Sequence, residues 1–217
     1  ALVAAACFIA SAMTATGLDR RIALTVLSKV GAKTHHIVIG AMVVGFLLSF
    51  IVPSTTARVA CLMPIMMGFV LAFKVDRKSR FAALLVITTA QTASIWNVGI
   101  KTAAAQNMVA IGFIEKQLGA QITWGEWFVA AAPFAALMTV ALFFIMTRMM
   151  APEMKEIAGG QEAIRQQLAE LGPMTLNQWK LLAVVLVLLG FWSTEKGLHN
   201  FDTTSTTIAA AALMRFP

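Results

Sequence analysis

The chain alternates between long apolar runs and short polar segments. His35–Phe73 is a 39-residue, mostly apolar block that the sequence Pro-Ser-Thr-Thr interrupts near its centre. Arg80–Leu118 is longer than one straight span needs and carries Trp-Asn-Val-Gly-Ile-Lys in its middle. Since about 20 apolar residues form a helix that crosses a bilayer, this pattern predicts an all-α polytopic membrane protein with two interrupted segments.

The lengths of these runs divide the chain into six parts. We expect the end of a transmembrane helix and an interfacial helix in 1–34, then a re-entrant helical hairpin in 35–75 with its tip at 53–56. A broken transmembrane helix is expected in 76–118, with its break at 96–101, followed by an outside loop and a transmembrane helix in 119–150. The remaining parts are a polar cytoplasmic segment in 151–177, and a transmembrane helix, an outside loop and the start of another helix in 178–217. Trp124 and Trp127 are the expected interfacial anchors of the fourth part.

Basic residues flank the first interrupted block on both sides. Asp19–Lys33 carries four basic residues against one acid, and so does Lys74–Arg80. Short Lys/Arg-rich loops stay in the cytoplasm, so both ends of the block are expected on the same side. Two tight full spans or a re-entrant hairpin would satisfy this; the polar tip favours the hairpin, because non-helical backbone at membrane depth persists where it lines a cavity. Pro53 ends the first arm, and the second is expected over Ala57–Val75.

The composition supports a membrane protein and argues against a nucleic-acid binder. The 217 residues are 59% hydrophobic and 12% charged. The formal net charge is +7, but the basic residues gather in short blocks between apolar runs, as membrane topology requires. Cys7 and Cys61 have no CxxC or metal-ligand spacing, and the apolar segments are nearly free of acids, so neither a metal centre nor an acid relay is expected.

Two consecutive interrupted segments with polar residues at their breaks are the sequence pointer to a transporter site at the bilayer midplane. Each second arm would point a helix N-terminus, with unpaired N–H groups and the positive dipole end, into one cavity, which favours an anion. Hydroxyl and amide side chains at the breaks would add donors for carboxylates. The candidate substrate-binding residues are Ser54, Thr55, Thr56, Arg58, Asn97, Gly99, Lys101, Thr102 and Asn107.

Arg58 stands in the first turn of the second hairpin arm, where a cation opposes the helix dipole and an unpaired charge in hydrocarbon costs several kcal/mol. A bound di- or tricarboxylate would offset that cost, because guanidinium suits bidentate carboxylate pairing. The alternative is that Arg58 pairs structurally with backbone carbonyls. Lys101 carries the same ambiguity.

Two other classes of protein compete with a transporter. An intramembrane hydrolase could use Ser54 as its nucleophile, but no histidine falls near mid-depth in an apolar segment to act as base. A non-transporting membrane assembly subunit would bind no anion at all. The transporter remains the leading interpretation.

The two breaks resemble those of the divalent anion:sodium symporter family. The family's hairpin carries Ser-Asn-Thr and a Leu-Pro-Ile-like end, and STTARVACLMPI at Ser54–Ile65 matches that length and ending, with Thr55 in place of the asparagine. Its broken helix reads Ser-Ile-Gly-Gly…Pro-Pro-Asn, and SIWNVGIKTAAAQN at Ser94–Asn107 matches that length, the first two residues and the final Asn. Trp96 and Asn97 replace the glycines, and Ala105-Gln106 replaces the prolines.

The resemblance implies a carrier of the exchanger branch, similar to bacterial citrate, tartrate and 2-oxoglutarate-malate translocators. In sodium-coupled members the lost asparagine and glycines help to coordinate sodium, so their absence disfavours sodium, and Arg58 offers a substitute positive charge. We therefore expect sodium-independent antiport of succinate, malate, 2-oxoglutarate, tartrate or citrate across a bacterial inner membrane, with sodium-coupled symport as the alternative. The family is built from two inverted repeats and forms homodimers; both ends of this chain look cut, so it is expected to be part of a longer carrier that holds the first repeat.

Overall fold

The computed structural model describes residues 2–52, 54–119, 121–157, 159–195 and 201–213. In these ranges every regular element is helical, and one isolated bridge pairs Lys33 with Glu156. The helices are α1 (Leu2–Thr16), α2 (Leu18–Val30), α3 (Thr34–Ile51), α4 (Thr55–Ala72), α5 (Arg80–Gly99), the 3-10 turn η1 (Lys101–Ala103), α6 (Ala105–Leu118), α7 (Trp124–Met149), α8 (Gly160–Glu170), α9 (Leu176–Ser193) and α10 (Thr203–Leu213). The predicted all-α class is confirmed.

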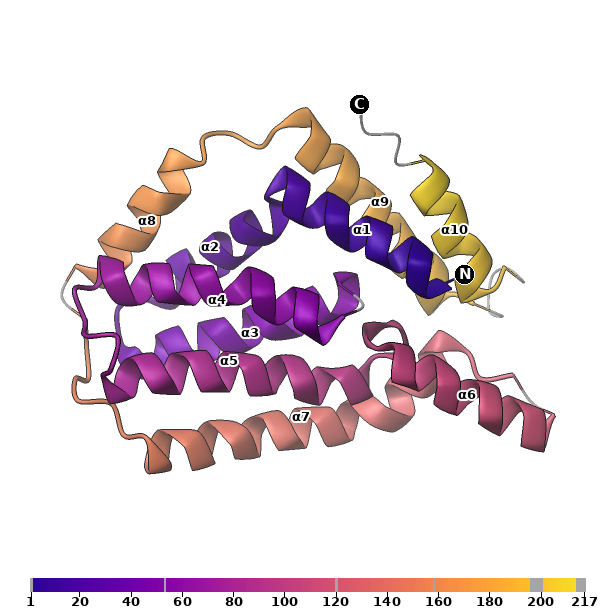
Figure 1. The fold of residues 1–217 in the computed structure, drawn as a ribbon, viewed down its shortest axis with the longest axis horizontal. Helices are drawn as coiled ribbons and strands as arrows, with labels where there is room; N and C mark the ends of the chain where they lie inside the picture. The colour runs from indigo at the N-terminus through magenta and orange to yellow at the C-terminus, as the bar shows by residue number, and fades with distance from the viewer. Residues whose placement is uncertain (1, 53, 120, 158, 196–200, 214–217) are drawn as a thin grey trace.

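The helices form two groups that α2 and α8 connect (Figure 1). Helices α3, α4, α5 and α7 run side by side, and α1, α9 and α10 pack together at the other side of the molecule. Helices α2 and α8 contact each other between the groups. Arg21 of α2 donates to the carbonyls of Leu171 and Pro173 and to Gln178 Oε1, which ties the α1–α2 corner to the start of α9.

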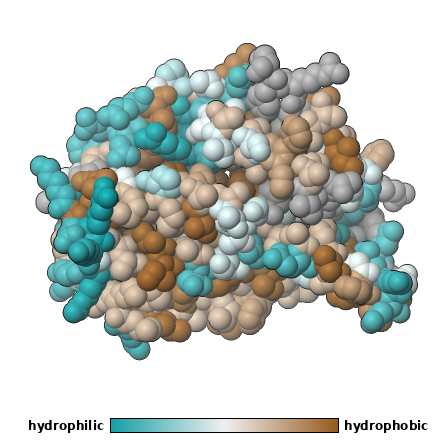
Figure 2. Space-filling model, viewed as in Figure 1, coloured by the Kyte–Doolittle hydropathy of each residue, from teal (hydrophilic) through white to brown (hydrophobic). Residues whose placement is uncertain are grey.

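Four helices are long and apolar enough to cross a membrane: α3, α5, α7 and α9. Helix α7 is the most apolar of them and has 11% of its span buried, so most of its surface faces outward. Figure 2 shows hydrophilic side chains gathered at the two ends of the long axis and over α8, with a mostly apolar band between them. This distribution is what a bilayer around the middle of the molecule requires.

Helices α3 and α4 form the predicted helical hairpin. The first arm ends at Ile51, and Val52 is extended. Ser54 begins the second arm as its N-cap: its hydroxyl accepts a hydrogen bond from the backbone N–H of Ala57 at 3.4 Å. Helical geometry therefore starts at Thr55, two residues before the predicted start. In Figure 1 the tip lies in the middle of the molecule, level with the end of α5, while α6 continues further along the same direction.

The break in the second interrupted segment lies later than the sequence suggested. Helix α5 continues through Gly99, and the non-helical segment is Ile100–Ala104, which contains the single turn η1. Packing extends the helix: the ring of Trp96 lies 4.3 Å from that of Phe46 on α3, centroid to centroid. Asn97 and Gly99 therefore belong to the last turn of α5 and not to the connecting loop.

At the end of the molecule opposite the hairpin tip, residues 153–155 contact the starts of two helices, α3 and α5. Thr34 N–H donates to Lys155 O at 3.0 Å, which fixes the start of α3. The carboxylate of Glu153 accepts from the backbone N–H groups of Arg80 and Phe81, at 2.7 and 3.2 Å, and so caps the start of α5. These hydrogen bonds, that from Arg80 above all, hold the pKa of Glu153 below its ordinary value.

Candidate functional site

The hairpin tip and the break of the second segment meet at one side chain, Arg58. It lies in the first turn of α4, and its side chain is fully buried. Nη1 donates to Ser49 Oγ on α3, and Nη2 donates to Asn97 Oδ1 on α5 and to the carbonyl of Ala103 at 3.1 Å. Nε donates to Ser54 O at 3.4 Å. The guanidinium thus connects both hairpin arms to the last turn of α5 and to the break itself.

The four acceptors around Arg58 are neutral oxygen atoms. They solvate the guanidinium and offset part of its desolvation cost, but they do not cancel its charge. Both second arms begin beside it: Arg58 belongs to the first turn of α4, and Ala103 O stands two residues before α6. Because helix N-termini carry positive partial charge, the two helix starts add to the positive charge of the guanidinium.

Two asparagines complete the connection. Asn97 accepts from Arg58 and donates through Nδ2 to the hydroxyl of Thr55 at the hairpin tip. Asn107, in the first turn of α6, donates through Nδ2 to the carbonyls of Asn97 and Ile100, the latter at 2.9 Å. Helix α5 therefore ends against the side chain of Asn107, which satisfies two of the carbonyls at the break.

One face of the two helix starts is open. Thr56 and Ala57 of α4 are exposed, and so are Ala105 and Gln106 of α6. The first N–H groups of a helix have no partner within the helix, so these turns can offer backbone donors to an anion. The Thr56 hydroxyl adds a side-chain donor at the same end of α4. Helix starts of this kind can hold an anion, and the positive charge of Arg58 is buried in the first turn of one of them.

Comparison with known proteins decides the family. The family described as the sodium:sulfate symporter transmembrane region matches residues 1–216. The chain belongs to this family. The resemblance to divalent anion:sodium symporters is thereby confirmed, and the four helices long and apolar enough to cross a membrane agree with a multi-pass membrane protein.

The relatives of this symporter-family chain include proteins whose names state different activities. A membrane protein of Cupriavidus necator is 52% identical over 217 residues, which is 100% of this chain and 42% of that protein. The sodium-dependent dicarboxylate transporter SdcS of Staphylococcus saprophyticus is 27% identical, covering 96% of this chain and 42% of that one. The citrate/succinate antiporter of Escherichia coli K12 is also 27% identical, over 92% of this chain and 42% of its own. The chain thus spans about 42% of the length of these relatives.

Three of the predicted site residues of this symporter-family chain are directed elsewhere. Lys101 Nζ donates to the carbonyl of Ile122 at 2.6 Å, and Thr102 Oγ1 accepts from the indole N–H of Trp124 at 3.3 Å, so both side chains are engaged with the start of α7. Gly99 is a packing position, because a Cβ there would stand 2.8 Å from the Cβ of Ala135. Ser54, Thr55, Arg58, Asn97 and Asn107 are brought together, with Thr56 beside them on the open face.

The sequence analysis missed Ser49, which is buried and accepts from Arg58 while its own hydroxyl donates to Gly45 O at 2.7 Å. A serine in an apolar helix, nine residues before an arginine across a predicted hairpin, was the available signal. No cluster of three or more His, Cys, Asp or Glu that could hold a metal occurs in the part of the chain that the structure describes.

Proposed function

We propose that the carrier containing this chain exchanges one di- or tricarboxylate for another across a bacterial inner membrane, without sodium. The similarity to the two named transporters does not distinguish exchange from sodium coupling, because both are 27% identical to the chain. The observation that carries the proposal is Arg58: a guanidinium already sits among neutral oxygens between the hairpin tip and the helix break. A fixed cation there leaves no need for a co-transported one.

The roles follow from the geometry of the site. Thr56 and the first N–H groups of α4 and α6 donate to a substrate carboxylate on the open face, with the hydroxyls of Ser54 and Thr55 at the same tip. Arg58 supplies charge from beneath and does not itself have to touch the anion. Asn97 and Asn107 hold the two helix starts in register. Lys101 and Thr102 have no part in the proposed substrate contacts, since Lys101 Nζ donates to the carbonyl of Ile122 and Thr102 Oγ1 accepts from the Trp124 indole.

Obligatory exchange is the expected consequence of a permanent charge. An uncompensated cation in the membrane interior costs several kcal/mol, whereas the same cation next to a bound dicarboxylate is compensated. The empty carrier therefore reorients slowly, and the loaded one reorients fast. The remaining substrate contacts and the expected homodimer interface belong to the proposal for the full-length carrier.

Uptake into proteoliposomes containing the full-length carrier tests the proposal. Labelled dicarboxylate should enter only when the vesicles hold an unlabelled dicarboxylate, and replacing sodium by choline on both sides should leave the rate unchanged. Uptake into empty vesicles driven by an inward sodium gradient would establish the alternative, sodium-coupled symport. Succinate, malate, 2-oxoglutarate, tartrate and citrate as internal counter-substrates would then rank the anions.

A further inference from the structure

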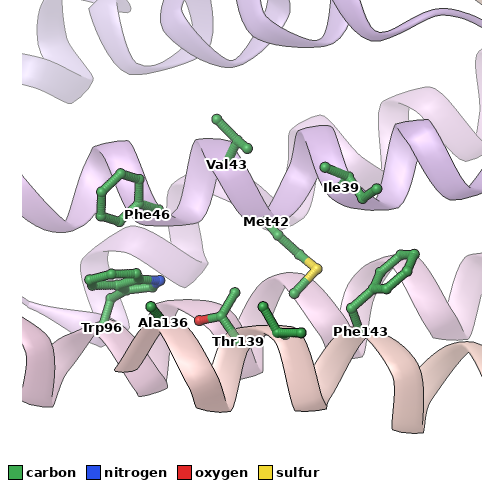
Figure 3. A pocket seen from close by; sticks show the side chains of 9 residues that line it. Ile39, Met42, Val43, Phe46, Trp96, Ala136, Thr139 and Phe143 are labelled. Atoms are coloured by element: carbon green, nitrogen blue, oxygen red, sulfur yellow. The ribbon is translucent and has the colours of Figure 1, made fainter. Parts of the chain in front are cut away.

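A groove separate from the polar site lies between α3 and α7, with α5 at its base. Its walls include Met42, Val43, Phe46, Trp96, Thr139 and Val140 (Figure 3), and we call it the α3–α7 groove. Its volume is about 370 Å³, within the range of roughly 300–1,000 Å³ that small-molecule pockets occupy. Val140 on α7 is 53% exposed, so the groove opens at the surface of this chain, along a helix that is apolar and long enough to cross a membrane. Charged metabolites are excluded by such a lining.

One polar group that lines this groove lacks a hydrogen-bond partner among the described residues. Trp96 is 7% exposed, and its Nε1–H has no hydrogen-bond partner among the described residues. Figure 3 shows the indole nitrogen turned toward the interior of the groove, on the side of Met42 and Thr139. The Thr139 hydroxyl donates to Ala135 O at 2.7 Å. A buried donor without an acceptor costs about 1–3 kcal/mol, so the site is complementary to a molecule that brings one acceptor.

A second tryptophan shows that an unpaired N–H alone does not make a ligand site. Trp192 is equally buried, and its Nε1–H also lacks a partner in the part of the chain that the structure describes. The cavity beside it has a volume of about 10 Å³, however, which leaves room for one water at most. Of these two tryptophans, Trp96 is the one that combines an unpaired donor with room for a ligand.

We propose that the α3–α7 groove binds an uncharged lipophilic molecule that carries one carbonyl oxygen, which enters from the bilayer and accepts a hydrogen bond from Trp96 Nε1. The apolar walls supply the affinity for the hydrocarbon part, and the indole N–H selects the carbonyl. The occupant would also touch α5 one residue before Asn97, which holds Arg58 and Thr55. The groove therefore stands next to the proposed transport site without belonging to it.

Photolabelling of the full-length carrier in liposomes tests this proposal, with benzophenone as the probe because it is an uncharged aromatic ketone. Irradiation should attach it to α3 or α7 within the groove, at Met42 above all, as mapped by peptide mass spectrometry. Fluorenone should displace the label about fivefold better than fluorene, which has the same shape without the carbonyl, since one hydrogen bond is worth about 1 kcal/mol and about 1.4 kcal/mol is tenfold.

Three variants decide whether the interaction is the proposed one. The Trp96→Phe variant should still be labelled by benzophenone but should lose the preference for fluorenone over fluorene. The matched variant Trp192→Phe should keep that preference. Ala136→Phe narrows the groove while leaving the Trp96 N–H in place, and should abolish the focused label. Labelling spread evenly over lipid-facing helices of the unmodified carrier, or an equal effect of fluorenone and fluorene on it, would overturn the proposal. Because this readout needs no transport, it stands or fails independently of the exchange mechanism.

Discussion

Arg58 is a charged side chain whose every nitrogen donates to a neutral oxygen: Nε to Ser54, Nη1 to Ser49, and Nη2 to Asn97 and Ala103. The sequence analysis weighed a substrate ligand against a structural pair with carbonyls. The contacts show the structural pairing, and the exchange proposal adds that the charge of Arg58 acts on the substrate. The planar fork of guanidinium suits this geometry, and a lysine ammonium could not reach four separated acceptors.

The charge of Arg58 can be cancelled without disturbing its contacts. In Asn97→Asp one carboxylate oxygen still accepts from Arg58 and the other accepts from the Thr55 hydroxyl, so folding should be retained. The net charge of the pair falls to zero, and dicarboxylate affinity should fall about tenfold or more, since about 1.4 kcal/mol of lost attraction is tenfold. Calorimetric titration of the purified full-length carrier measures this, with its melting temperature as the check on folding. An unchanged affinity would remove the electrostatic role of Arg58.

Ser49 should matter for stability although it lies in the middle of an apolar helix. Ser49→Ala removes the acceptor of Arg58 Nη1 and leaves a buried donor unpaired, at a cost of about 1–3 kcal/mol. The matched control is Ser94→Ala on α5, where the exposed hydroxyl donates only to Ala90 O, and the expected change is within about 0.5 kcal/mol. Thermal unfolding in detergent compares the melting temperatures of the two variants. Equal melting temperatures would show that the hydrogen bond from Arg58 to Ser49 does not stabilise the fold.

At the scale of elements, the two interrupted segments differ in how far sequence could place them. Pro53 and the hydroxyls after it made the hairpin predictable, because proline ends a helix and serine caps the next one. The break after α5 was placed too early, since Trp96 and Asn97 look like a loop in sequence and are kept helical by contacts with Phe46 and Thr55. Such contacts join residues some 40 to 50 positions apart, so local pattern does not contain them.

Gly99 is expected to be intolerant of any side chain. A Cβ there would stand 2.8 Å from Ala135 on α7 and 2.8 Å from the Trp96 ring, so Gly99→Ala should destabilise the protein by about 1–3 kcal/mol through overpacking of α5 against α7. Gly112 of α6 is the control, because a Cβ there meets nothing within 4 Å. Gly112→Ala should be neutral or stabilise by about 0.5–1 kcal/mol. Melting temperatures of the two variants should therefore move in opposite directions or differ clearly.

The start of α5 gives the fold a predictable dependence on pH. The pKa of Glu153 lies below its ordinary 4.5 in the folded protein, chiefly because the Arg80 N–H donates to the carboxylate. Its stabilising effect is thus fully present above pH 4.5 and is lost as the pH falls through the lower, folded pKa. Melting curves across this acidic range should show a decline that is shallower in Glu153→Gln. Parallel curves for both proteins would assign the decline to other carboxylates.

At the scale of the whole molecule, the chain forms a helical frame that holds Arg58 between the hairpin tip and the helix break. Run lengths and basic flanks were enough to predict an all-α membrane protein with a hairpin and a broken helix, and the family match confirms the class. The run lengths and basic flanks could not reveal which polar residues face each other. Ser49 was missed because its partner Arg58 lies across the hairpin, and Lys101 was assigned to the site although it donates to the carbonyl of Ile122.

The central claim is that the buried charge of Arg58 takes the place of a co-transported cation. The most direct measurement is the affinity of the purified full-length carrier for its best dicarboxylate by calorimetric titration, with sodium and then with choline as the only monovalent cation. We predict the same dissociation constant in both solutions. An affinity that appears only with sodium, or rises steadily with its concentration, would contradict the account.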